Sequence, residues 1–470
     1  MLLIGVATAV ATLTLQTIDL TERVALLAVL LGSLFFLAFS IRYPITLVFA
    51  IILYESLLSW RQAEQVQILG YNRLLFYAVF VGVFGVAVFY RFFILQRKLK
   101  IYWIDIALLA LIGAYGITAV FAIDRAAARP GFTYFLATAL TFYTVRLVIL
   151  SKKDVNKVIG FLLGFMFFEA ALGFWQRITN TGLLYVSSVS GGPVFPRATG
   201  TLGNGLGWYL TIGYILAFNL WLYNRKTKQS WLYFSILGMV TIGLVVANTR
   251  GAWVDCAIAT LISLVPFLKV QKNKLLLIFG AAVGGTAVLL SSSAAWGRLI
   301  SIWEQLANPG QSTIGFRFYI WQAAIEMFRQ NPLFGVGPDN FRPQLANYVT
   351  PEAQNFLRLS AERSFNTHHA GLQTLSETGL VGALAFAFFI FTFVALTWRL
   401  YKRLKHHDRP LAMALLMFAI MSTFSILYGG YSYGGYTQVG ALYFLLAGLT
   451  VALTAVTPKP SLPPKPPNQP

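Results

Sequence analysis

Residues 231–270 read WLYFSILGMVTIGLVVANTRGAWVDCAIATLISLVPFLKV. Two apolar runs, 231–248 and 253–270, are joined by a short turn that carries Arg250. Each run approaches the roughly 20 residues with which a helix crosses a bilayer. The stretch therefore predicts two antiparallel membrane helices with a cation in the turn between them.

Similar apolar runs recur along the chain, which is 57% hydrophobic. They predict an all-α fold, a polytopic membrane helical bundle of about 12–14 transmembrane helices within one domain, 1–457. The lower count allows for 2–16 and 44–60, the weakest runs, and the proline-rich tail 458–470 is expected to be disordered and cytoplasmic. The remaining predicted spans are 24–40, 74–90, 103–123, 131–149, 157–175, 205–223, 231–248, 253–270, 275–291, 376–397, 411–428 and 437–455.

Basic residues predict the orientation. When the links between the spans are assigned to alternating sides, every lysine, from Lys98 to Lys465, falls on one face. The positive-inside rule makes that face cytoplasmic, together with both termini. The opposite face has only arginines as cations, from Arg23 to Arg363. The net charge of +20 therefore indicates topology and an anionic lipid or phosphate ligand; no basic and aromatic surface typical of nucleic-acid binding is present.

The long outer loop, about 292–370, contains arginine but no lysine. Arginine binds phosphate through two parallel hydrogen bonds, whereas lysine acts as a point charge. Apolar residues at 318, 321, 325 and 328 follow helical spacing and predict an amphipathic helix that ends at Pro332 and packs this stripe on the bundle. Arg317 would lie in its first turn. The loop is thus expected to be partly helical and to hold functional cations.

Two shorter outer segments carry further candidates. The stretch Arg197 to Asn204, RATGTLGN, combines a cation with small residues that let backbone N–H groups approach a ligand. The turn at Arg250 is so short that its cation lies at or below the lipid headgroups, where an ionisable group is a functional candidate by default. Alternatively, Arg250 only anchors the turn to lipid phosphate, with Trp253 in the aromatic belt.

His368 and His369 end the outer loop, and a histidine near neutral pKa can act as a base on a hydroxyl. A solvated histidine pair at a helix start is the alternative. Two adjacent histidines supply too few ligands for a metal, so no metal is expected. The single cysteine, Cys256, excludes a disulfide within the chain. Glu377 follows His368 in the next predicted span and is expected to cap or orient the histidine segment.

Together these motifs resemble the O-antigen ligase and O-antigen polymerase superfamily of bacterial membrane glycosyltransferases. The resemblance rests on 197–204, on 249–253, on Arg317 to Trp321 with the PLFGVGP run 332–338, and on His368 with Glu377-Thr378-Gly379. Residues 1–150 match only as generic membrane helices. Two departures stand out: the family usually has Asn where His369 stands, and Pro where Gly205 stands.

The resemblance implies a chemistry without metal or other cofactor. Such enzymes, in the bacterial inner membrane, take a glycan from undecaprenyl pyrophosphate at the periplasmic face and join it to an acceptor hydroxyl, with inversion. Arg197, Arg250 and Arg317, helped by Asn204, would bind the diphosphate. His368 would be the general base or a group that positions the acceptor, catalytic together with Arg250 and Arg317, and supported by His369 and Glu377. The partners would be the donor, a lipid A core or other glycan acceptor, and membrane lipids.

The acceptor is not fixed by the shared motifs. A ligase transfers the polymer to lipid A core, a polymerase extends the chain, and related members glycosylate protein; the Arg250 and His368 motifs favour the ligase. A different class, an anion transporter for a ligand such as bicarbonate, stays open. Against this class, transporters usually carry charges near the bilayer midplane, whereas the predicted midplanes of this chain hold few ionisable residues, of which Glu169 is the clearest. The functional candidates instead lie on one face.

Overall fold

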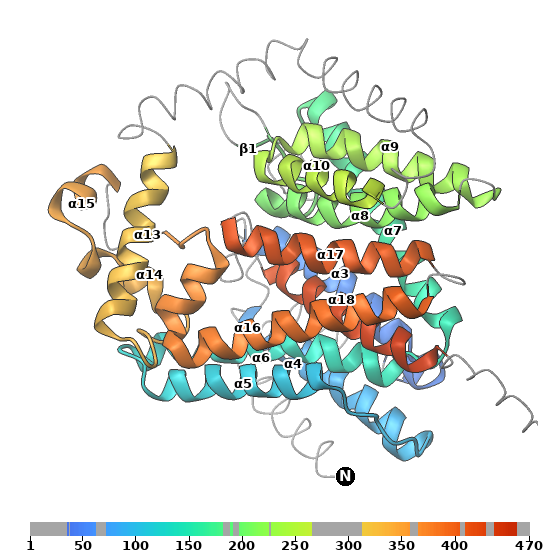
Figure 1. The fold of residues 1–470 in the computed structure, drawn as a ribbon, viewed down its shortest axis with the longest axis horizontal. Coiled ribbons are helices and arrows are strands. Elements are labelled where there is room, and N and C mark those ends of the chain that lie inside the picture. The colour runs from blue at the N-terminus through green and yellow to red at the C-terminus, as the bar shows by residue number, and fades with distance from the viewer. Residues whose placement is uncertain are drawn as a thin grey trace, which may run out of the picture.

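The structure is a computed structural model (Figure 1). The predicted spans 2–16 and 275–291, most of 24–40 and the tail 458–470 lie outside the residues it describes. The described residues are 35–36, 38–62, 72–181, 189–190, 197–224, 227–265, 313–357, 365–404, 409–428 and 437–457.

Nearly every described segment is helical, and each predicted span in these ranges is a helix. Helix starts follow local capping chemistry: Asp124 accepts from the N–H groups of Ala126 and Ala127 at the start of α6, and Ser151 and Asp154 form a capping box at α7. The first helices are α3 Thr46–Gln62, α4 Asn72–Phe89 with the π-helical turn η1 Tyr90–Ile94, α5 Trp103–Val120, α6 Arg125–Val148 and α7 Lys152–Thr179.

The connection after α7 holds the described strands, β1 Val189–Ser190 and β2 Arg197–Ala198, which form an antiparallel pair. The 3-10 turn η2 Gly203–Gly205 then leads into α8. The remaining elements are α8 Leu206–Tyr223, α9 Gln229–Ala247, α10 Arg250–Leu264, α13 Thr313–Gln330, α14 Phe341–Gln344, η5 Leu345–Tyr348, α15 Pro351–Leu357, α16 Ala370–Leu404, α17 Arg409–Tyr428 and α18 Thr437–Val456.

The bundle has the surface of a membrane protein. Among the described residues, 5 helices, α5, α7, α8, α9 and α16, are long and apolar enough to cross a bilayer, and shorter apolar helices lie in α4, α10, α17 and α18. Large apolar side chains remain exposed on them, such as Trp231 (72%) and Phe391 (71%). Such a surface is stable against lipid and not against water. The chain is an all-α polytopic membrane protein.

The core is continuous through the bundle, where α5 packs on α16, α6 on α18, and α8 on α9 and α17. The outer loop has a separate core between α13 and the α14–α15 region, with Ile320, Met327 and Phe341 fully buried. In Figure 1 this loop region lies beyond one end of the bundle helices. The partly helical outer loop is therefore confirmed within 313–357.

The prediction for the apolar stripe of α13 was wrong in part. The helix itself forms and ends at Gln330, two residues before Pro332. Its buried face, however, contains Ile320 and Met327, whereas Phe318 and Ile325 are exposed (54% and 39%). The physical reason is that α13 packs on α16 and on the apolar residues of the outer loop through a different face, which contains Ile320 and Met327, so two residues of the predicted stripe stay exposed.

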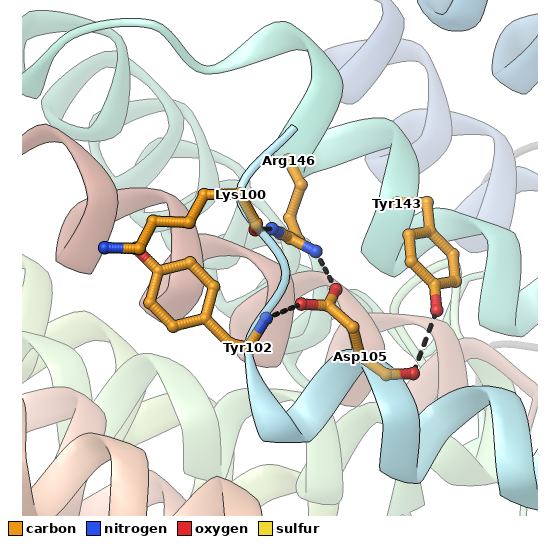
Figure 2. A network of polar contacts seen from close by, with 5 residues as sticks. All are labelled: Lys100, Tyr102, Asp105, Tyr143 and Arg146. Atoms are coloured by element: carbon orange, nitrogen blue, oxygen red, sulfur yellow. Dashed lines mark hydrogen bonds and ion pairs between the residues drawn. The ribbon is translucent and has the colours of Figure 1, made fainter. Parts of the chain in front are cut away.

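A buried ion pair joins α5 to α6 (Figure 2). The Arg146 guanidinium contacts the Asp105 carboxylate, and both side chains are almost fully buried. Arg146 Nη2 also donates to Lys100 O (2.6 Å), and Asp105 Oδ2 accepts from Tyr102 N (2.7 Å). Each charge thus has further hydrogen-bond partners, as a buried pair requires.

We expect Arg146→Met to lower the free energy of unfolding by about 3–5 kcal/mol, because Asp105 would keep a buried charge without its partner. The matched control is Arg329→Met, since Arg329 forms an exposed pair with Glu326 at 3.7 Å, for which about 1 kcal/mol or less is expected. Denaturant unfolding in detergent micelles measures both. Equal losses in the two variants would contradict a special role for the buried pair.

Candidate active site

Arg197 lies in β2, where Ser190 is its partner in β1. Its side chain is half-buried, and its Nε is buried without a hydrogen bond to any described residue. The chain then enters the bundle at Thr199–Thr201, turns through η2 and begins α8. Arg197 thus presents a cation with unused donor capacity just ahead of the first turn of a membrane helix.

The Arg250 turn packs against the start of α8. Asn248 adopts a left-handed conformation (φ 51°) that ends α9, and Arg250 is the first residue of α10. Close packing requires glycine on both sides: a Cβ on Gly207 would lie 2.4 Å from Thr249 Oγ1, and one on Gly251 would lie 2.4 Å from the Trp208 ring. The glycine of the RGAW turn is therefore explained by its contact with α8.

Gly173 of α7 brings the first two motifs together. A Cβ added there would contact Ala198 at 3.5 Å and Val246, near the end of α9, at 3.8 Å. For Asn204 and Arg250 the structure describes the backbone alone. The backbones of the Arg197, Asn204 and Arg250 segments thus converge where α7, α8 and α9 meet.

A second group forms between α13 and the end of the outer loop. Trp321 Nε1 donates to Thr367 O (3.0 Å), and the Trp321 ring meets the His369 ring edge to face at 5.4 Å. Phe316 lies 6.4 Å from the His368 ring. Arg317, one residue along α13, is exposed. These contacts hold the helix of Arg317 beside His368.

His368 has the properties of an uncharged base. Its ring is half-buried, and its backbone adopts a left-handed conformation (φ 50°), which costs energy in a residue other than glycine. Burial and then the positive charge of Arg317 lower the pKa of His368 from 6.5 to about 4. The imidazole is therefore neutral at pH 7 and can accept a proton.

His369, which stands where the related sequences usually have Asn, caps the helix that follows it. Its Nδ1 accepts a hydrogen bond from Leu372 N (3.2 Å), at the first turn of α16. A side-chain acceptor before a helix satisfies one of its otherwise unpaired N–H groups, and Asn serves equally well. His369 thus performs the capping function that the expected Asn would perform, and it also packs on Trp321.

Helix α16 starts at Ala370, six residues before the predicted 376, and is broken at Gly379 (φ 59°, ψ −157°). Residues 332–337 form a segment that we call the strap. In an unbroken helix, the backbone N–H and C=O groups on the two sides of Gly379 would pair with one another; here they form hydrogen bonds to the strap instead. These bonds run from Val336 N to Ser376 O (2.9 Å), Gly337 N to Glu377 O (2.8 Å), Leu380 N to Pro332 O (2.8 Å) and Val381 N to Leu333 O (3.2 Å).

The strap requires glycine at both contact surfaces. A Cβ on Gly379 would lie 2.4 Å from the backbone of Leu333, and one on Gly335 would lie 2.4 Å from that of Glu377. Beyond the strap, Asn340 exchanges hydrogen bonds with the backbone of Asp124, at the α5–α6 connection (2.8 and 3.0 Å). The PLFGVGP run thus attaches the outer loop to the bundle through backbone hydrogen bonds to α16.

Buried Glu377 connects the strap region to the histidine segment. Its Oε1 accepts from Phe341 N and from Gln373 Nε2, both at 3.3 Å. Gln373 Oε1 in turn accepts from Thr367 Oγ1 (3.3 Å), directly before His368. The arrangement agrees with an orienting role for Glu377, which stays a prediction. Gln373 and Thr367 were not identified from the sequence as parts of the site. The available signal was a polar Gln close to the start of an apolar helix.

The candidate residues therefore form two groups, one around Arg197 and Arg250, and one around Arg317 and His368. Figure 1 shows β1 and the α13–α15 region toward the same end of the bundle. One group supplies cations next to a helix start, and the other supplies a cation beside a neutral base. Such a combination can bind an anionic leaving group and remove a proton from a hydroxyl.

Part of the chain matches a known protein family. Residues 235–387 match the family model described as O-Antigen ligase. The matched region includes the Arg250 turn, α13 with Arg317, the strap and the segment from His368 to Glu377. Arg197 and Asn204 precede it. No curated protein matches the chain.

The capping role of His369 predicts a difference between two substitutions. His369→Asn keeps an acceptor for Leu372 N and is expected to retain stability within about 0.5 kcal/mol. His369→Leu keeps an apolar contact with Trp321 but removes the acceptor, and should lose about 0.5–2 kcal/mol. Equilibrium unfolding in detergent compares them. If both variants lost the same amount, the ring contact and not the cap would be the important interaction.

Proposed function

Since the chain belongs to the O-antigen ligase superfamily, we propose that it is a metal-independent, inverting glycosyltransferase of the bacterial inner membrane. It transfers a glycan from undecaprenyl pyrophosphate to an acceptor hydroxyl at the periplasmic face. The acceptor we propose is lipid A core, which makes the protein an O-antigen ligase. The observation that carries the proposal is the position of His368, which lies beside the helix of the cation Arg317 and whose pKa that cation helps to lower.

The donor side needs positive charge on the leaving diphosphate. Arg197, Arg250 and Arg317, with Asn204, would hold its oxygens and stabilise the charge that develops as the anomeric bond breaks. By analogy with oxyanion donors, each such contact is worth on the order of 10²–10³ in rate. The carrier already holds an activated glycan, so no nucleotide is needed.

The acceptor side needs a base. His368 would remove the hydroxyl proton while the oxygen attacks the anomeric carbon, a contribution of roughly 10²–10⁴. One displacement inverts that carbon. The His369 cap and the Glu377–Gln373–Thr367 chain would keep the imidazole at a fixed position relative to Arg317. A helix cap and a hydrogen-bond chain are suited to such fine positioning.

The proposal is tested in a deletion strain of the host, by gel analysis of its lipopolysaccharide and assay of its undecaprenyl-linked glycans. We expect bare core, with polymer accumulating on the carrier. Complementation with Arg250→Ala or His368→Ala should fail, whereas the exposed control Arg329→Ala should restore the pattern. Core capped by a single repeat would indicate a polymerase instead, and an unchanged pattern would indicate another acceptor or transport. Normal output from both site variants would refute the assignment.

The pKa of His368 predicts the pH profile. Because the folded protein holds this pKa at about 4, the base stays neutral as the pH falls through 6.5. The acid limb of kcat/KM, which reports the free enzyme, is expected near pH 4. Arg317→Gln removes one cause of the shift and should move the limb to higher pH, whereas Arg329→Gln on the same helix should not. A wild-type limb centred at pH 6.5 would contradict the role of His368.

A further inference from the structure

The segment Thr199–Thr201 is non-helical chain inside a bundle of membrane helices. Thr199 and Thr201 are buried (4% and 7% exposed), and Leu202 and Leu206 continue the buried stretch into α8. Non-helical backbone at such a place is stable only where the protein supplies hydrogen-bond partners for its N–H and C=O groups. The side chains that form hydrogen bonds with this segment therefore fix its position in the bundle.

Gln176 of α7 satisfies the upstream half of the segment. Its Oε1 accepts from Thr199 N (3.2 Å) and Gly200 N (2.8 Å), and its Nε2 donates to Gly200 O (3.1 Å). The Gln176 side chain is completely buried. One amide thus replaces the hydrogen bonds that a strand or helix would have provided.

Glu169 satisfies the downstream half. Its Oε2 accepts from Thr201 N (2.8 Å) and its Oε1 from Thr201 Oγ1 (2.5 Å). The segment approaches so closely that a Cβ on Gly200, which has φ 54°, would lie 2.4 Å from Glu169 Oε2. The two oxygens of one carboxylate can thus accept from both donors of one threonine at once.

The two side chains lie on one face of α7, because 169 and 176 are seven residues, nearly two helical turns, apart. The segment consequently runs along about 10 Å of α7, with Arg197 before it and Asn204 after it. An ionisable residue among membrane helices is costly and is a functional candidate by default. The catalytic scheme above does not use Glu169.

We propose that Glu169, together with Gln176, is a positioning residue of the donor site. By fixing Thr199–Thr201 against α7, it sets the place of the Arg197 cation and of the Asn204 turn that precedes α8. The inference rests on the proposed function, since it assigns these residues to the diphosphate of the lipid-linked donor. In this proposal, Glu169 contacts the Thr199–Thr201 segment and does not contact the substrate.

The test compares Glu169→Gln and Thr201→Val in purified protein with the host's undecaprenyl pyrophosphate-linked glycan as donor. Each variant removes one hydrogen-bonding group from the contact between Glu169 and Thr201. We expect this loss to raise the donor KM roughly tenfold, equivalent to about 1.4 kcal/mol. The acceptor KM should not change. The matched control is Thr450→Val, because among the described residues the buried Thr450 hydroxyl bonds only to Leu446 O, within α18.

A double variant separates positioning from general stability. If Glu169 acts through Thr201, Glu169→Gln with Thr201→Val should raise the donor KM no more than the stronger single variant does. Unfolding temperature and binding of undecaprenyl pyrophosphate alone are measured in parallel. Weaker binding of this carrier by folded variants is the expected result.

Other outcomes overturn the inference. An unchanged donor KM in active, folded variants would remove Glu169 from the donor site and leave the proposed function standing. Lower stability with a proportional loss of active protein, and an unchanged donor KM, would reduce Glu169 to a structural residue. If the wild-type protein neither transfers glycan nor binds undecaprenyl pyrophosphate, the proposed function fails and this inference fails with it.

Discussion

The exchange of backbone hydrogen bonds at Gly379 is the interaction on which the outer part of the molecule depends. An uninterrupted α16 would pair Ser376 O and Glu377 O with N–H groups one turn later, but the strap occupies both sides of that gap. Because unpaired backbone groups are costly in an apolar bundle, the strap cannot leave unless the broken turn of α16 closes and pairs these groups within the helix. The loop core, the histidine segment and the start of α16 are therefore fixed to one another.

The same constraint accounts for the buried polar side chains elsewhere. Glu169 and Gln176 pair with the non-helical chain ahead of α8, and Asp105 and Arg146 pair with each other and with the backbone before α5. In each case a charged or amide group stands where an irregular segment meets apolar helices. These buried charged and amide groups mark places where the chain departs from a helix, as the hydrogen-bonding requirement of the bilayer demands.

The candidate site combines rigid and exposed parts in a way that suits its proposed chemistry. The two neighbours of His368 are fixed, His369 by its cap on α16 and Thr367 by a hydrogen bond from Trp321, while Arg317 stays exposed on a helix with its own core. Burial and the nearby charge of Arg317 lower the pKa of His368, so its imidazole is uncharged at pH 7. A diphosphate bound at Arg317 would offset that cation and favour the imidazolium formed during transfer.

The sequence by itself determined the membrane helices, because length and apolar composition are local properties: α7, α9 and α10 lie where the runs predicted them. The motif residues also indicated the O-antigen ligase family that residues 235–387 match, since residue types and their spacing can be read from the sequence alone. Only the tertiary structure decided which face of α13 is buried, that α16 breaks at Gly379 to receive the strap, and that Gln373 and Gln176 are partners of the site segments. These features depend on contacts between segments far apart in the chain, and no local pattern encodes which distant backbone group a buried side chain will meet.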